Sequence, residues 1–194
     1  LIILHNPALP KSRLSTMTKQ PRLLTLACLV LATNVFATPA IDNKAEESRP
    51  NIVVILADDL GYSDIASYGS EINTPNLDQL AQQGLRFSNY YTSASCAPTR
   101  AMLLTGVDSH RTGVANIAEA LTSEQAESPF YRGSLNHNVV TIATLLKDSG
   151  YHTSMVGKWH LGYEDKSLMP INRGFEQTVM MPFSGGDNWT DQSY

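Results

Sequence analysis

The sequence predicts an α/β fold with a mostly parallel sheet flanked by helices. Its apolar patterns alternate along the chain as strand, helix, strand, helix, helix, strand, which is typical of this fold class. Residues 51–56 form a continuous apolar run rich in β-branched side chains, as expected for a parallel strand buried on both faces. Polar clusters follow three of the predicted strands, and ligands bind beyond the carboxyl ends of strands in such sheets. The sequence therefore predicts a site along one rim of the sheet.

The first strand and helix are bounded by polar and helix-breaking residues. The strand over residues 51–56 ends just before Asp58 and Asp59. Thr74 and the proline after it then open a helix, which Gly84 closes.

The next predicted strand is followed by Cys96 and a helix. Residues 85–92 alternate apolar and polar side chains, which predicts a half-buried strand. Cys96 lies just before a predicted helix, because Pro98 suits a first helical turn and Gly106 can end the helix.

The last predicted elements are a helix and a strand. Either Asn138 or Thr141 can cap the helix, and residues 151–156 form the strand. Lys158 and His160 follow this strand. Because residues two apart share a face of an extended backbone, we expect their side chains to point the same way.

Four segments organise the chain. Residues 1–16 precede the first methionine and are interpreted as an upstream or non-native extension outside the fold. Residues 17–37 have the basic start, short apolar stretch and small residues of a signal peptide, and residues 38–49 form a polar linker. Residues 50–194 form the folded domain. We expect a protein exported to the periplasm or the extracellular space, without stable membrane insertion.

The charge balance disfavours nucleic acid as a partner. Residues 1–37 hold four basic and no acidic side chains, so the rest of the chain has ten basic and 18 acidic ones, a net charge of −8. A nucleic-acid binder needs a basic face. An anionic substrate would have to be held by a few placed cations or by a metal.

Cys96 is the main candidate for chemistry. The other cysteine, Cys28, lies in the predicted signal peptide, so an exported chain would carry Cys96 as a single thiol. A lone thiol can be a buried bystander or half of an intermolecular bridge. Its place at a helix N-terminus, with Arg100 one turn further on, favours a site that binds an oxyanion.

Two other clusters can complete such a site. Asp58 and Asp59 supply oxygen donors of the kind that Ca²⁺ and Mg²⁺ prefer, although an isolated acidic pair is also typical of a solvated turn. Lys158 can neutralise charge and His160 can transfer protons, although such a pair is often only solvated.

Three stretches of the chain resemble the sulfatase family, the formylglycine-dependent branch of the alkaline phosphatase superfamily. The first is the run from Pro50 to Gly61, which resembles the family's metal-binding opening. The second is Cys96-Ala97-Pro98-Thr99-Arg100, followed by Leu103-Leu104-Thr105-Gly106. The third is the run from Gly150 to Gly162, which contains Gly157-Lys158-Trp159-His160. The resemblance implies that residues 50–194 are the N-terminal part of an arylsulfatase-like catalytic domain.

The resemblance implies hydrolysis of sulfate esters by a nucleophile made from Cys96. This residue would be oxidised by a formylglycine-generating maturation enzyme, and the hydrated aldehyde would attack sulfur and later release sulfate by elimination. Asp58, Asp59 and the modified Cys96 would bind a divalent cation, Ca²⁺ in preference to Mg²⁺.

The resemblance also assigns roles to the polar side chains around this nucleophile. Arg100 would stabilise the hydrate, His160 would handle its protons, and Lys158 and Ser184 would contact a small sulfate ester or a sulfated glycan. The family supplies further metal ligands from later sequence, so we expect the chain to be truncated at its C-terminus and inactive alone.

Two alternatives remain at this point. A phosphonate or phosphate monoester hydrolase of the same superfamily would use the same residues. An exported binding module would keep Cys96 as a thiol.

Overall fold

The computed structural model describes residues 2–5 and 49–186. The chain divides into two compact units, one formed by Leu1–Pro7 with Pro50–Tyr194 and the other by Ala8–Arg49. The predicted signal peptide lies outside the described residues, as does the predicted linker up to residue 48. All that follows concerns the first unit.

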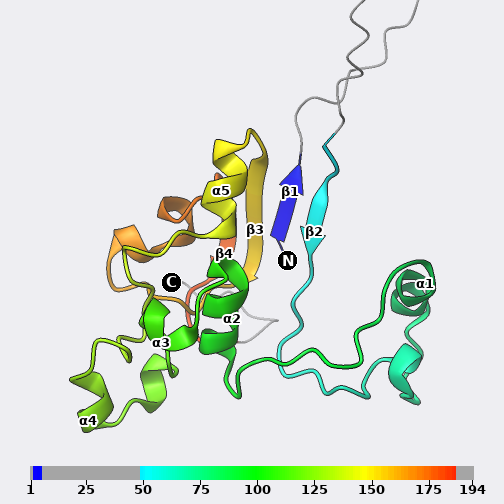
Figure 1. Cartoon of the computed structure of the whole chain (residues 1–194), viewed down its shortest axis with the longest axis horizontal. Helices are drawn as coiled ribbons and strands as arrows, with labels where there is room; N and C mark the ends of the chain where they lie inside the picture. Colours follow the sequence, from blue (N-terminus) through cyan, green and yellow to red (C-terminus); the bar gives the residue numbers. More distant parts are fainter. Residues whose placement is uncertain (1, 6–48, 187–194) are drawn as a thin grey trace, which may run out of the picture. The chain divides into compact units, whose positions relative to one another are not determined.

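A four-stranded sheet with the order β2-β1-β3-β4 organises this unit (Figure 1). The strands are β1 (Ile2–His5), β2 (Ile52–Val54), β3 (His152–Lys158) and β4 (Gln177–Met181). β3 pairs with β4 in parallel, and β1 pairs with both β2 and β3 in antiparallel fashion. β2, β3 and β4 therefore run in the same direction, and the predicted α/β fold with a mostly parallel sheet is confirmed.

Strand β1 differs from the sequence-based expectation. Residues 1–16 are predicted from the sequence to be an extension outside the fold. Instead, Ile2–His5 pair with two strands of the sheet. The register places Ile3 opposite Val53 on one side and Ser154 on the other. An apolar run with β-branched residues suits such a position, because a central strand must satisfy backbone groups on both edges.

Helices connect the strands. The α-helices are α1 (Pro75–Gln83), α2 (Cys96–Thr105), α3 (Ser109–Thr112), α4 (Ser123–Ala126) and α5 (Ile142–Asp148). Short 3-10 helices lie between them: η1 (Ala66–Tyr68), η2 (Ala118–Ala120), η3 (Lys166–Leu168) and η4 (Pro170–Asn172). In the part of the chain that the structure describes, no helix is both long and apolar enough to cross a membrane.

The predicted caps of the longer helices are confirmed. Thr74 and Gly84 flank α1. The hydroxyl of Thr141, one of the two predicted caps, accepts a hydrogen bond from the backbone of Thr144 at the start of α5. Gly106 ends α2 in the left-handed conformation with φ 67°. Helix α2 begins at Cys96 itself, one position earlier than predicted.

The core lies between the sheet and helices α2 and α5. Its members include Ala97, Ala101 and Leu104 of α2, Ala143 of α5 and Met155 of β3. Trp159, which follows β3, is fully buried and packs edge to face against Phe175 with ring centroids 6.3 Å apart. Its indole N–H donates to the carbonyls of Gly162 and Leu168, both at 3.0 Å. The segment just after β3 is thus fixed by packing and by hydrogen bonds.

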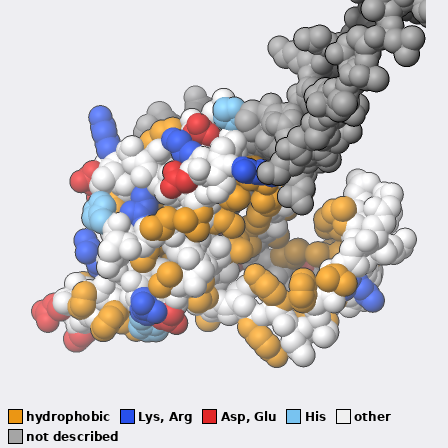
Figure 2. Space-filling view, turned by 45° about the horizontal axis from the view of Figure 1, so that its top comes forward, with side chains coloured by type: hydrophobic (Ala, Val, Ile, Leu, Met, Phe, Trp, Pro, Cys, Tyr) orange, Lys and Arg blue, Asp and Glu red, His pale blue; other side chains and the backbone are white. Residues whose placement is uncertain are grey.

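Two predictions about strands are wrong. The strand over residues 51–56 is expected to be buried on both faces, but Val53 is 55% and Ile55 68% exposed, whereas Ile52 and Val54 pack against the core, so only one face of this run is covered in the described residues. Residues 85–92 form no strand, and Leu85 is 87% exposed. This segment has no neighbouring strand to pair with among the described residues. Its alternating pattern alone therefore does not make it a strand, because tertiary context decides strand formation. Figure 2 shows hydrophobic side chains at the surface over much of the visible face.

Gly162 gives a test of the packing beside Trp159. It has φ 109°, and a Cβ there would lie 2.6 Å from the Cβ of Ser134. Gly162→Ala should lower the free energy of unfolding by about 2–4 kcal/mol, because a left-handed backbone and overpacking both add cost. Gly69 is the matched control, since it has φ 104° and a Cβ there would have no other atom within 4 Å. Urea denaturation should show a smaller loss for Gly69→Ala, and equal losses would contradict the packing argument.

Candidate active site

Cys96 stands at the first position of α2, where its backbone lies among the free N–H groups of the helix. It is a free, half-buried cysteine, and its Sγ lies 3.3 Å from Nδ1 of His160. The two residues are 64 positions apart in sequence, and the fold brings them together as a thiol and an imidazole in direct contact. A nucleophile and a proton acceptor at this separation can act as a unit.

His160 is held in an unusual backbone conformation. Its φ is 56°, and only Asp59, with φ 55°, shares a positive φ among the described residues other than glycine. His and Asp tolerate the left-handed region better than most residues, and such conformations concentrate at functional sites. The His160 side chain is 4% exposed, and its backbone N–H donates to the carbonyl of Pro182 at 3.0 Å.

This conformation corrects one expectation about Lys158 and His160. The two were expected to alternate along an extended backbone and to point the same way. β3 ends at Lys158, and the positive φ of His160 breaks the alternation. The Lys158 side chain reaches Asp58, whereas the His160 ring reaches Cys96.

Glu119 is a site residue that the sequence analysis missed. Its Oε2 lies 3.1 Å from Nε2 of His160, so the two ring nitrogens of His160 face Cys96 on one side and Glu119 on the other. Glu119 belongs to η2 and lies 41 positions before His160 in sequence. No local motif marks it, because a single glutamate among several acidic residues carries no recognisable spacing.

The pKa of Glu119 reflects its surroundings. Partial burial raises the pKa, but hydrogen bonds from its own backbone N–H and from the side chains of His160 and Ser184 outweigh that effect and lower the pKa overall. Ser184, a predicted substrate contact, is therefore linked to the same cluster through Glu119.

Arg100 ties α2 to the end of β3. Its Nε donates to the carbonyl of Trp159 at 2.8 Å, and its second guanidinium nitrogen donates to the carbonyl of Lys158. One planar fork thus satisfies two consecutive carbonyls. Burial lowers the pKa of Arg100, and electrostatic interactions with Asp58 and Cys96 oppose that effect. Arginine remains charged at neutral pH despite such a shift.

Lys158 and Asp58 form an ion pair. The Nζ of Lys158 lies 3.0 Å from one carboxylate oxygen of Asp58 and 3.3 Å from the other. The Lys158 side chain is only 10% exposed, whereas that of Asp58 is 53% exposed. The pair links the residues after β2 to the end of β3, although 100 positions separate them.

The described residues meet the needs of a divalent cation in part. Asp58 and Asp59 are exposed and offer hard oxygen donors. Asp58 is engaged by Lys158, and within residues 2–5 and 49–186 no group of three His, Cys, Asp or Glu side chains is arranged to hold a metal. These residues do not make a complete metal site, so a bound cation would need further donors.

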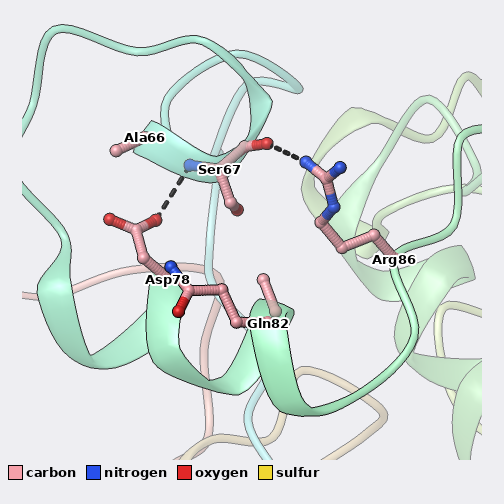
Figure 3. Close-up of a pocket in the computed structure, with 6 residues that line it drawn as sticks. Ala66, Ser67, Asp78, Gln82 and Arg86 are labelled. Atoms are coloured by element: carbon pink, nitrogen blue, oxygen red, sulfur yellow. Dashed lines mark hydrogen bonds between the residues drawn. The ribbon is translucent and has the colours of Figure 1, made fainter.

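A separate pocket of about 450 Å³ lies between η1 and α1 (Figure 3). Asp78 accepts a hydrogen bond from the backbone N–H of Ser67 at 2.8 Å, and Arg86 donates to the Ser67 carbonyl. Both charged side chains of this pocket are thus bonded to the backbone of Ser67, and the pocket lining contains none of the predicted catalytic or metal-binding residues.

The sequence is similar to known sulfatases. The family profile named Sulfatase matches residues 50–194. An arylsulfatase of Klebsiella aerogenes is 43% identical over 76% of this chain and 31% of its own length. An uncharacterized sulfatase of Schizosaccharomyces pombe is 41% identical over 77% of this chain and 27% of its own length. The chain thus spans about a third or less of the length of these relatives.

Solved structures show the same likeness. The crystal structure of Ps i-CgsB aligns with a TM-score of 0.58 and 34% identity over 69% of this chain and 28% of its own. The PsFucS1 sulfatase from Pseudoalteromonas sp. aligns with a TM-score of 0.53 and 34% identity over 66% and 25% of the two chains.

The hydrogen bonds of Arg100 can be tested by Arg100→Lys. Lysine keeps the charge but cannot reach both carbonyls with one planar group, so the free energy of unfolding should fall by about 1–3 kcal/mol. Arg86→Lys is the matched control, because Arg86 donates to one carbonyl at an exposed site. Its effect should stay within about 0.5 kcal/mol. Equal losses in urea denaturation would show that Arg100 is not a structural tie.

Proposed function

Because the chain belongs to the sulfatase family, we propose that it forms part of a sulfuric ester hydrolase whose nucleophile is a formylglycine made from Cys96. The observation that carries the proposal is the contact of 3.3 Å between Cys96 Sγ and His160 Nδ1 at the start of α2. This contact joins the residue that would be modified to a group that can take a proton from it.

The chemistry of the modified residue suits sulfate esters. A hydrated formylglycine supplies a hydroxyl nucleophile, and it can release sulfate by elimination, which an ordinary serine ester cannot. The residues of the chain would prepare this centre. His160 Nδ1 would accept a hydroxyl proton at position 96, and Arg100 would hold the backbone of residues 158 and 159 in place. Lys158 forms an ion pair with Asp58 at the same rim of the sheet, and it would neutralise negative charge on the sulfate.

A divalent cation is the second part of the proposal, Ca²⁺ in preference to Mg²⁺. Asp58 and Asp59 would hold it together with donors from beyond the described residues, and it would supply charge stabilisation for the sulfate oxygens. Support comes from the family, the hard donors of the pair and their exposure.

The proposed substrate is a small sulfate ester or a sulfated glycan, with Ser184 near it. A carbohydrate fits the similar structures, since one of them is Ps i-CgsB in complex with k-i-k-neocarrahexaose. A formylglycine-generating enzyme would be the maturation partner. We propose an exported protein without nucleic-acid partners, supported by the leader pattern and by the net charge of −8 over residues 38–194.

A phosphonate or phosphate monoester hydrolase is the closest alternative, because phosphate and sulfate share the tetrahedral shape that these residues would bind. The relatives named as arylsulfatases favour the sulfate ester. A binding module with unmodified Cys96 is the other alternative, and the state of position 96 decides it.

The first experiment measures that state. The chain is coexpressed with a formylglycine-generating enzyme, and the mass of the tryptic peptide 87–100 is determined. We expect the mass of the aldehyde or its hydrate. Cys96→Ser is the control, because it tests whether the change requires the thiol. An unmodified thiol after coexpression would favour the binding module.

The second experiment measures turnover by the modified chain. An aryl sulfate and the matching aryl phosphate are assayed with Ca²⁺ present. We expect no turnover of either ester by this chain alone, because the metal site is incomplete in the described residues. A longer chain that restores the length of the relatives should hydrolyse the sulfate faster than the phosphate. A faster reaction with the phosphate would favour the phosphatase alternative.

A further inference from the structure

We propose that Glu119 is a positioning residue that orients the imidazole of His160 toward position 96. In this arrangement the Glu119 carboxylate accepts a hydrogen bond from Nε2–H of His160, which leaves the Nδ1 lone pair free to accept a proton from the group at position 96. The role in turnover rests on the proposed function, whereas the hydrogen-bond arrangement does not.

The geometry of the three side chains is that of a nucleophile, a base and an orienting acid. Sγ of Cys96 lies 3.3 Å from Nδ1, and Oε2 of Glu119 lies 3.1 Å from Nε2. An imidazole that contacts a carboxylate through one nitrogen is fixed in tautomer and ring orientation, because a carboxylate can only accept. The other nitrogen then becomes the acceptor.

The fold restricts where Glu119 can go. The preceding residue, Ala118, packs closely against Gly133. A Cβ added at Gly133 would lie 2.7 Å from the Cβ of Ala118. Ile117 packs against the core, and its backbone N–H donates to the Asn116 side chain at 2.9 Å. Helix η2 is thus anchored at Ala118 and at the residue before it, which places the Glu119 side chain, 42% exposed, within reach of His160.

His160 has little freedom of its own. The ring is 4% exposed, its backbone is left-handed, and its N–H is bonded to Pro182. A buried imidazole must satisfy both nitrogens, since an unpaired buried polar group costs about 1–3 kcal/mol. Glu119 satisfies Nε2, so its loss should remove the partner that keeps the proton on Nε2 and leaves Nδ1 as the acceptor toward position 96.

The experiment measures the alkylation of Cys96 in the unmodified chain by iodoacetamide at one fixed pH. The labelled fraction of tryptic peptide 87–100 is followed by mass spectrometry, which separates Cys96 from Cys28. Glu119→Ala should lower the rate roughly tenfold, the usual scale for loss of a residue that orients another ligand or base. Glu124→Ala is the matched control, because Glu124 is a nearby exposed glutamate, and it should leave the rate unchanged.

A double-mutant cycle separates positioning from a general structural effect. His160→Ala should lower the rate by at least as much, and Glu119→Ala should add nothing in the His160→Ala background, because Glu119 acts through His160. Additive losses, or an unchanged rate in Glu119→Ala, would overturn the proposal.

A second measurement reports the hydrogen bonds of the imidazole directly, so it still tests the proposal if a variant changes the access of iodoacetamide to Cys96. Nitrogen-15 NMR of the imidazole should show Nε2 protonated and Nδ1 unprotonated in the wild type. Glu119→Gln keeps an acceptor oxygen and should keep a protected Nε2–H signal, whereas Glu119→Ala should lose that protection. A wild-type Nδ1–H form, or loss of the signal in Glu119→Gln, counts against the proposal. Both measurements use the thiol, so they are independent of whether Cys96 is modified or any sulfate ester is hydrolysed.

Discussion

The pair of hydrogen bonds from Arg100 to the carbonyls of Lys158 and Trp159 is the constraint on which the site depends. It joins the first turns of α2 to the end of β3, so the residue at position 96 and the residues after β3 are placed by one side chain. The backbone N–H groups of Trp159 and His160 are bonded in turn to the carbonyls of Met181 and Pro182. Consecutive residues of this segment are thereby tied to α2 on one side and to the end of β4 on the other.

This restraint makes the left-handed backbone of His160 tolerable. A positive φ costs free energy. The surrounding hydrogen bonds and the burial of Trp159 offset that cost and hold the left-handed backbone in place. The two side chains of this segment have different partners. Lys158 pairs with Asp58, and the ring of His160 lies between Cys96 and Glu119.

The fold was predictable wherever local signals decide. Thr141, Gly84 and Gly106 bound their helices as expected, because capping acts within a turn of the residue concerned. The strand expected over residues 85–92 does not form, since a strand needs a partner that its own sequence cannot supply. Strand β1 shows the converse: Ile2–His5 find partners on both sides, which no inspection of the first residues alone reveals.

For the site, the sequence by itself determined which residue types stand after each strand and at the start of α2: Asp58, Asp59, Cys96, Arg100, Lys158 and His160. These lie in contiguous motifs, so their chemistry can be read without a structure. Only the tertiary structure decided how they pair. It assigned Arg100 to backbone carbonyls, Lys158 to Asp58, and His160 to Cys96 and Glu119. The physical reason is range: a motif records neighbours along the chain, whereas a hydrogen bond between residues 41 to 100 positions apart exists only once the sheet and helices have packed.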